Sequence, residues 1–191
     1  MGVSKVSLML PGEVPLGSVA LSELESCGLE PLVVVVRADD PLSWLPPARE
    51  GSGRRTETCL TAHLGLSFSL RCGLNAVLPM QPDAIVVALA DQPFVKAALV
   101  RELIGIFKAH PELDYVASRN DGTAMPPVLF GRSMFMALQG LDGDQGAAAL
   151  LRSPDYKGRV LSPESALCFM DADTKEDFGK IQTEWLMRNG S

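Results

Sequence analysis

Residues 83–93 read DAIVVALADQP, an apolar run that ends in a carboxylate, an amide and a proline. Its β-branched residues predict a buried strand over residues 83–90. Because ligands of open parallel sheets bind beyond the carboxyl ends of the strands, Asp91 stands where a functional group is expected. The same carboxylate could instead cap the helix that begins near Val95, and this stretch alone does not separate the two roles.

The rest of the chain alternates between short apolar runs and amphipathic stretches of helical length, which predicts an α/β fold. PLVVVVR, residues 31–37, is apolar on both faces, as in a parallel strand covered by helices. We therefore predict a doubly wound, mostly parallel sheet. Helices are expected at residues 16–27, 67–78, 95–110, 132–138, 147–151 and 174–187, and further strands at 114–119, 158–162 and 166–171.

Three features bear on how these elements are connected. Residues 38–57 are rich in proline, glycine and charge, which predicts an exposed segment that is either a binding loop or a surface loop. Pro126 and Pro127 predict a break before the next helix. No internal repeat or low-complexity segment divides the sequence, so a single domain spanning residues 1–191 is expected.

Composition argues against several classes of protein. The net charge is −6 and the 17 Lys and Arg residues are scattered, so nucleic acid is not expected as a partner. The four cysteines form no C-x-x-C pair, which favours buried reduced thiols over a metal or redox site. No apolar run approaches the roughly 18 residues needed to span a bilayer, and the N-terminus lacks signal-peptide features, so a cytoplasmic protein is expected.

A second acidic cluster occurs in FMDADTKED, residues 169–177. If residues 166–171 form a strand, alternation places the carboxylates of Asp171 and Asp173 on one face. A strand-end carboxylate such as Asp91, with a second carboxylate reaching in from elsewhere, would suit Mg²⁺, which is held by one or two carboxylates plus phosphates and water. Taken alone, the cluster is equally compatible with a turn that carries helix-capping acids.

Two glycine-bounded segments each lead into a helix. LGLSFSLRCG, residues 64–73, places small residues at a helix start, where backbone N–H groups favour anions or polar base edges. DGDQGAAALL, residues 142–151, has a similar form. Each pattern is weak by itself, and both are also found where nothing binds. His63 and His110 lack a convincing partner in the sequence and are interpreted as structural.

In this order, the segments resemble one family, the MobA-like nucleotidyltransferases, and especially the molybdenum cofactor cytidylyltransferase branch and its purine-catabolism relatives that support xanthine dehydrogenase. The resemblance extends from Met1 to about Phe178. Its matching segments are MGVSK (1–5), LGLSFSLRCGL (64–74), VVALADQPFV (86–95), MPPVLFGRSMFMALQGLDGDQGAAALL (125–151) and DADTKEDF (171–178). Several motifs in order are far more specific than any one of them.

The resemblance implies a reaction in which a terminal phosphate on a molybdopterin-type cofactor attacks the α-phosphorus of CTP or GTP and pyrophosphate leaves. It implies Mg²⁺ as cofactor, with Asp91 as the principal ligand and Asp173, helped by Asp171, completing the site. Lys5 would neutralise the triphosphate. Phosphoryl transfer of this kind depends mostly on positioning and on charge neutralisation, which these residue types supply.

The resemblance also implies the binding residues. Gly65, Ser69 and Gly73 would lie against the base and ribose of the nucleotide. Asp144 and Gly146 of the GDQG turn would help to form the side that receives the pterin phosphate. Glycine suits these positions because it has no Cβ to obstruct close approach of the backbone.

One departure from the family pattern concerns the N-terminus. Members open with a strand and a glycine-rich loop, Leu-Ala-Ala-Gly-x-Ser-x-Arg, before Met-Gly-x-x-Lys, whereas this sequence begins at Met1. Either Met1 is an internal methionine of a longer protein, which we favour, or the chain is a shortened relative. Apolar surface is then expected beside residues 33–37 and 85–90, together with lower stability and poor nucleotide binding.

The leading hypothesis is thus a nucleotidyltransferase of molybdenum cofactor maturation, with CTP preferred as donor. A second hypothesis is a non-catalytic accessory or cofactor-binding module for a molybdenum hydroxylase such as xanthine dehydrogenase. A third, a sugar-phosphate nucleotidyltransferase of the same broad fold, is disfavoured because GDQG and DADTKED match the pterin branch better.

Overall fold

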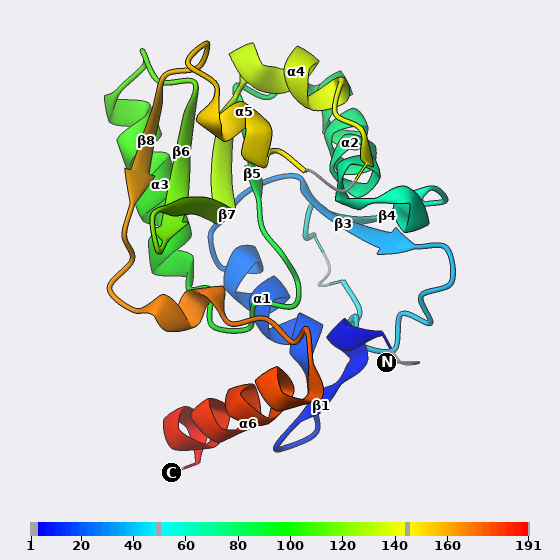
Figure 1. The fold of residues 1–191 in the computed structure, drawn as a ribbon. Helices are drawn as coiled ribbons and strands as arrows, with labels where there is room; N and C mark the ends of the chain where they lie inside the picture. Colours follow the sequence, from blue (N-terminus) through cyan, green and yellow to red (C-terminus); the bar gives the residue numbers. More distant parts are fainter. Residues whose placement is uncertain (1–3, 49–50, 144–145, 191) are drawn as a thin grey trace.

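The computed structural model describes residues 4–48, 51–143 and 146–190 (Figure 1). The strands are β1 Met9–Leu10, β2 Val14–Pro15, β3 Leu32–Arg37, β4 Arg54–Cys59, β5 Ala84–Val87, β6 Tyr115–Asn120, β7 Thr123–Gly131 and β8 Gly158–Leu161. The α-helices are α1 Leu16–Glu25, α2 Leu66–Val77, α3 Ala97–Ala109, α4 Phe135–Gln139, α5 Ala148–Arg152 and α6 Lys175–Asn189. Short 3₁₀ helices are η1 Lys5–Ser7, η2 Ala62–Leu64, η3 Leu78–Met80, η4 Arg132–Met134 and η6 Ala166–Phe169.

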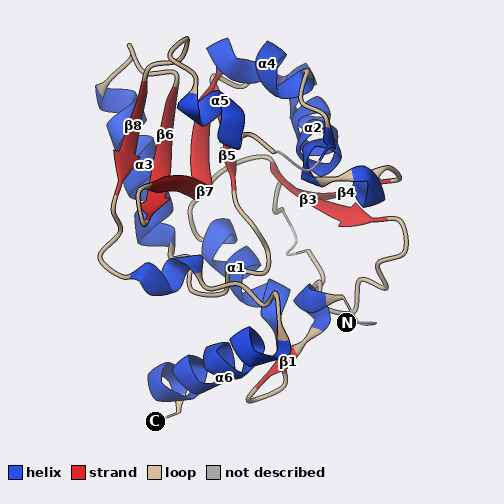
Figure 2. Ribbon diagram, viewed as in Figure 1, coloured by secondary structure: helices blue, strands red, loops and turns tan. Residues whose placement is uncertain are grey.

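The larger sheet has the order β5-β7-β6-β8 and is covered by helices on both faces (Figures 1 and 2). β7 is antiparallel to β5 and β6, whereas β6 and β8 are parallel, so β7 is the strand that runs against its neighbours. Because side chains alternate along a strand, Val116 and Leu129 pack against Leu103 of α3. Tyr115 and Phe130 face the opposite way, toward the buried residues of α2 and α4. The expected α/β fold is confirmed.

The strands do not form one continuous sheet. β3 and β4 make a separate parallel pair, and β5 lies at the edge of the four-stranded sheet. Within the described ranges, β3 and β5 therefore each have one edge without a strand partner. All four residues of β5 are only half-buried, and so are Leu32–Val35 of β3. The strand predicted over residues 83–90 is confirmed at Ala84–Val87, but its residues are half-buried rather than fully buried, and its pairing ends at Val87 instead of Ala90.

Four strands lie where the sequence predicted none: the two-residue strands β1 and β2, and the longer strands β4 and β7. β4 begins inside the segment expected to be exposed and ends two residues beyond it, and it was missed because its polar residues RRTETC carry no apolar pattern. β7 runs through the expected break at Pro126 and Pro127, which are joined by a cis peptide bond. The pairing of β7 with β6 shifts between Ala117 and Ser118, so the two prolines fall at an irregularity where no ladder hydrogen bond is required of them.

The predicted strand over residues 166–171 was also wrong. Residues Ala166–Phe169 form the 3₁₀ helix η6, whose first turn is capped by the Ser165 hydroxyl accepting from the Leu167 N–H. Cys168 and Phe169 are buried against α3. Their burial explains the apolar run, which a short helix satisfies as well as a strand does.

The last helix follows the predicted start. At the beginning of α6 the Thr174 hydroxyl accepts from the Asp177 N–H, and the Asp177 carboxylate accepts from the Thr174 N–H, a complete capping box. Ile181 of α6 is fully buried with Leu10 and Leu16, so α6 packs on the N-terminal elements (Figure 2). Over the ranges that the structure describes, none of the helices combines the length and the apolar character that a bilayer crossing demands.

Candidate functional site

Three segments that are distant in sequence bring charged groups together. Lys5 begins η1, Asp91 lies in the turn after β5, and Asp171 and Asp173 follow η6. The Lys5 ammonium donates a hydrogen bond to the Asp173 carboxylate across 168 positions of sequence. Lys5 also lies within the electrostatic field of Asp91 and Asp171. The structure therefore unites the four residues predicted for the metal and catalytic roles.

The pKa shifts of these groups report their mutual proximity. Burial raises the pKa of Asp91, and repulsion from Asp173 adds to this while Lys5 opposes it. Burial also raises the pKa of Asp171, and both Asp173 and Asp91 raise it further. The hydrogen bond to Asp173 raises the pKa of Lys5. Because these carboxylates are partly buried and repel one another, binding of a cation beside them is favourable.

Close packing of η1 on α1 positions Lys5. A Cβ at Gly17 would lie 2.6 Å from Cε3 of Trp44 and 2.8 Å from Cβ of Val6, so the absence of a side chain at this position lets η1 and the indole approach the helix. Trp44 is itself buried, and its Nε1 donates to the Asp40 carboxylate at 3.1 Å. The backbone that carries Lys5 is thus held by packing through its neighbour Val6.

A buried alanine brings the acidic segment to Asp91. Ala172 is fully buried in an apolar cluster that also contains Phe94 and Leu10. Phe94 follows Asp91 by three residues, so this cluster fixes both acidic segments against the N-terminal elements. The proximity of Asp171 and Asp173 was predicted, but the reason given for it, alternation along a strand, was wrong.

Several buried polar side chains lack a hydrogen-bond partner among the described residues, and Gln92 and Ser67 are the two of them that are fully buried. Gln92 is fully buried, and neither its amide nitrogen nor its amide oxygen makes a hydrogen bond within the described residues. The same holds for the hydroxyl of Ser67 at the start of α2. Burial of an amide without a partner is visible only in three dimensions, so the sequence alone did not single out Gln92.

The segment predicted to face the nucleotide begins α2. Gly65 is buried at the N-cap with a φ of 133°, a conformation that favours glycine, and the helix that follows runs for 12 residues. Ser69 is half-buried in its second turn. Gly73 has a packing role as well, because a Cβ there would lie 2.9 Å from Cγ2 of Val35 in β3.

Gly146, the last residue of the GDQG stretch, lies against the same helix. Gly146 is buried with a φ of 54°, and a Cβ on it would lie 3.5 Å from Cδ2 of Leu66. Arg71 of α2 donates from Nη1 to the carbonyl oxygen of Leu141 at 3.2 Å, which ties the preceding loop to the helix. Asp144 lies outside the described residues. The two segments predicted to bind nucleotide and pterin are therefore neighbours through Leu66 and Gly146.

The candidate site offers carboxylate oxygens as possible metal ligands. Among the residues that the structure describes, no three His, Cys, Asp or Glu side chains are gathered tightly enough to hold a metal ion alone. Mg²⁺ usually takes one or two protein carboxylates and fills its remaining positions with phosphate oxygens and water. The oxygen donors of Asp91, Asp171 and Asp173 fit that chemistry.

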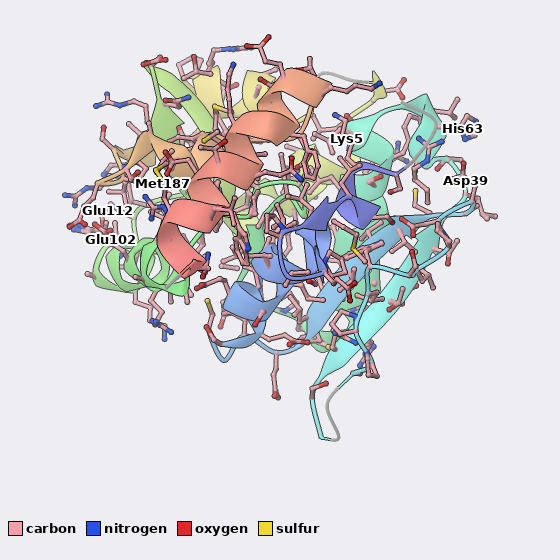
Figure 3. The ribbon with its side chains drawn as sticks, turned by 90° about the horizontal axis from the view of Figure 1, so that it is seen from below. Lys5, Asp39, His63, Glu102, Glu112 and Met187 are labelled. Atoms are coloured by element: carbon pink, nitrogen blue, oxygen red, sulfur yellow. The ribbon has the colours of Figure 1, made fainter. Side chains whose placement is uncertain are left out.

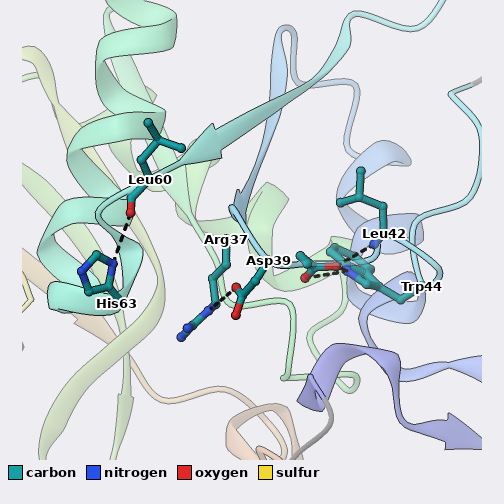
Figure 4. Close-up of polar contacts among 7 residues, drawn as sticks. Arg37, Asp39, Leu42, Trp44, Leu60 and His63 are labelled. Atoms are coloured by element: carbon teal, nitrogen blue, oxygen red, sulfur yellow. Dashed lines mark hydrogen bonds and ion pairs between the residues drawn. The ribbon is translucent and has the colours of Figure 1, made fainter.

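A second polar region lies at the carboxyl ends of β3 and β4. A hollow of about 220 Å³ is lined by Arg37, Ala38, Asp39, Cys59, Leu60, Ala62 and His63. Arg37 pairs with Asp39 at 3.0 Å, and Nδ1 of His63 lies 3.2 Å from the carbonyl oxygen of Leu60 (Figure 4). Lys5, Asp39 and His63 are all visible from below the sheets (Figure 3). The hollow was not predicted.

Comparison with known proteins gives the family. Residues 1–160 match the model of the MobA-like NTP transferase domain, and the chain belongs to this family. The purine catabolism protein PucB of Bacillus subtilis (strain 168) is 30% identical over 190 residues, covering 95% of this chain and 89% of PucB. The predicted resemblance is thereby confirmed.

Solved structures share the fold. The crystal structure of Rv0371c from Mycobacterium tuberculosis H37Rv in complex with manganese has a TM-score of 0.74 and 22% identity, covering 95% of this chain and 93% of that one. The molybdopterin-guanine dinucleotide biosynthesis protein A of Archaeoglobus fulgidus has a TM-score of 0.65 and 18% identity, covering 96% and 91%. At these identities the likeness establishes the fold alone.

Proposed function

We propose that this chain is a divalent-metal-dependent nucleotidyltransferase of molybdenum cofactor maturation. It transfers CMP, or alternatively GMP, from a nucleoside triphosphate to the terminal phosphate of a molybdopterin-type cofactor and releases pyrophosphate. Mg²⁺ is the proposed metal and CTP the preferred donor. The observation that carries the proposal is the convergence of Lys5 with Asp91, Asp171 and Asp173 from three separate segments.

The arrangement of the chain suits this reaction. Asp91 follows the carboxyl end of β5, and Gly65 follows that of β4, as expected for a ligand that binds beyond the strand ends. The backbone N–H groups at the start of α2 offer polar contacts to the nucleotide. Gly146 lies close to Leu66 at that helix start, which supports a proposed arrangement in which the nucleotide and the pterin phosphate meet there.

Each charged residue has a defined task. Lys5 neutralises the triphosphate, and Asp91 with Asp173 binds the cation, helped by Asp171. A bound divalent ion offsets the negative charge that otherwise repels the attacking phosphate and stabilises the leaving pyrophosphate. The protein supplies position and charge, which is most of what a phosphoryl transfer requires.

The named relatives support the same direction. The family is described as MobA-like NTP transferases, PucB is a purine catabolism protein, and the Archaeoglobus protein is named for molybdopterin-guanine dinucleotide biosynthesis. The mycobacterial structure holds manganese, a divalent ion with the same preference for oxygen ligands as magnesium.

The test is pyrophosphate release from CTP, or from GTP, with Mg²⁺ and molybdopterin. Asp91→Asn keeps the size of the side chain but removes its charge, and activity should fall at least about 100-fold, since a metal ion contributes several kcal/mol and each ~1.4 kcal/mol is a factor of ten. Asp83→Asn is the matched control at the other end of β5, where the side chain is 99% exposed. Equal loss in both variants, or no loss in Asp91→Asn, would refute the assignment.

A second candidate is a non-catalytic accessory module that binds the pterin cofactor for a molybdenum hydroxylase such as xanthine dehydrogenase. It is favoured by the lack, within the described ranges, of a ready three-ligand metal group. Tight binding of molybdopterin without pyrophosphate release from either nucleotide would establish this function instead of transfer.

A further inference from the structure

We propose that the Lys5 ammonium is an exchangeable internal counter-ion, which occupies Asp173 until a divalent metal ion takes its place. The inference rests on the proposed function for the presence of the metal. It concerns a different property, namely that metal and triphosphate bind cooperatively because both act on the same lysine.

The Lys5–Asp173 contact has the character of a reversible pair. The two side chains are 39% and 61% exposed, so water competes for both partners. Ion pairs exposed to this degree contribute little net stability, and water readily replaces either partner. The pair can therefore open at small cost when a stronger ligand for either group arrives.

The surroundings of Lys5 explain why a cation is needed there. Asp91 and Asp171 raise the pKa of Lys5 in addition to Asp173, so three carboxylates act on one ammonium group. Among the described residues, no other lysine or arginine forms an ion pair with Asp91 or Asp173. One positive charge only partly offsets three negative ones, whereas a divalent ion with Lys5 nearby would offset them more fully.

The exchange requires only the side chain to move. Val6, next in sequence, is held between Gly17 and Trp44, which fixes η1 on α1. Lysine carries its charge on a flexible four-carbon stem, so its ammonium can leave Asp173 while the backbone stays in place.

Cooperativity follows from this geometry. A triphosphate that attracts the Lys5 ammonium releases Asp173, and a metal ion that takes Asp173 releases Lys5 for the triphosphate. Each ligand therefore removes a contact that opposes the other, and by linkage the affinity gain must be reciprocal. Lys5 thus acts as a switch between an empty site and a loaded one.

The experiment measures Mn²⁺ binding alone, by electron paramagnetic resonance titration without nucleotide. Lys5→Met removes the competing ammonium, and Mn²⁺ should bind about fivefold more tightly, the factor that corresponds to loss of one exposed ion pair. Lys180→Met is the matched control, because Lys180 pairs with Glu176 and Asp177 of α6. It removes the same charge and should leave Mn²⁺ affinity within about twofold of wild type, the size of a weak exposed pair.

A double-mutant cycle locates the effect. In an Asp173→Asn background, Lys5→Met should no longer tighten Mn²⁺ binding, because the carboxylate for which lysine and metal compete has gone. Unchanged Mn²⁺ affinity in Lys5→Met, or a gain that persists in the Asp173→Asn background, would overturn the exchange while leaving the metal site intact. Absence of Mn²⁺ binding in wild type and Lys5→Met alike would instead overturn the proposed metal site itself.

Discussion

Two exposed ion pairs in this molecule are similar in chemistry and exposure but differ in the sequence separation of their partners and in the charged groups near them. Lys5 pairs with Asp173 and Arg37 pairs with Asp39, and in each pair both side chains are more than one-third exposed. The first pair joins residues 168 positions apart, whereas the second joins residues two positions apart.

The two ion pairs differ most in the charged groups that lie near them. Asp91 and Asp171, whose pKa values burial raises, both interact electrostatically with Lys5 and Asp173. The hydrogen bond from Arg37 is the main cause that lowers the pKa of Asp39, and a backbone hydrogen bond and the nearby His63 act in the same direction in this solvated loop. An ion pair therefore indicates a functional site when other charged groups from distant segments are held near it despite their mutual repulsion. A pair between exposed residues that are close in sequence indicates only an ordinary surface interaction.

The comparison is tested most strongly by activity. Asp173→Asn should reduce pyrophosphate release about 100-fold, because it removes one ligand from a metal that contributes several kcal/mol. Asp39→Asn makes the same chemical change at a carboxylate that is no less exposed, 75% against 61%, and should alter the rate less than about twofold. Comparable losses in the two variants would show that the hollow at β3 and β4 belongs to the reaction as well.

Gln92, which directly follows Asp91, tests the buried part of the candidate site. Its amide is fully buried without a partner, which costs about 1–3 kcal/mol relative to an apolar group of the same shape. Gln92→Met should therefore raise the free energy of unfolding in urea by about 1 kcal/mol or more.

Gln139→Met supplies the control for Gln92→Met. Gln139 is exposed and donates to Asn75 at 3.0 Å, so its replacement should not stabilise the protein. If Gln92→Met is instead destabilised, the amide makes a hydrogen bond in the free protein in solution, to water or to another protein group.

The pH dependence of stability gives a smaller effect. The pKa of Asp91 is raised above its ordinary value of 3.8, so the folded protein holds this proton more tightly than the unfolded chain does. The free energy of unfolding therefore falls as pH rises from the ordinary pKa to the raised one, and the full penalty is present above it. Asp91→Asn should melt a few degrees above wild type at pH 7, where ~1 kcal/mol corresponds to about 2–4 °C.

The same variant provides its own control at low pH. Below the ordinary pKa of 3.8, Asp91 is protonated in both states, and the difference between the two proteins should vanish. A melting temperature that is lower in Asp91→Asn across the whole range would mean that the charged carboxylate stabilises the fold.

Sequence patterns predicted most of the helices because amphipathic spacing and capping are local properties. The Thr174–Asp177 capping box, for example, joins two residues only three positions apart at the start of α6. β4 was not predicted because RRTETC has no apolar face. β7 was not predicted because its two prolines, which lie where the hydrogen-bond ladder is interrupted, were interpreted as a break. Strand pairing is decided by partners far along the chain, which a local pattern does not contain.

The charged cluster could be predicted only through the resemblance to a family, since nothing local connects Lys5 to Asp173. The residues that hold the cluster in place were less visible. Ala172 draws the acidic segment inward, and Gly17 admits Trp44 beside η1. Small apolar residues cannot be recognised as important from the sequence, because their role is to let neighbouring segments pack closely.

The smallest expected effect concerns the Arg37–Asp39 pair itself. Arg37→Ala removes an ion pair whose side chains are 58% and 75% exposed, and the urea midpoint should stay within the error of measurement. Cys59 and His63, which line the same hollow, keep their own contacts with Thr61 and Leu60 in the variant. A clear loss of stability would show that Arg37 organises the strand ends of β3 and β4. The Arg37–Asp39 and Lys5–Asp173 pairs would then differ in the burial of the groups around them, and not in how much each ion pair contributes to stability.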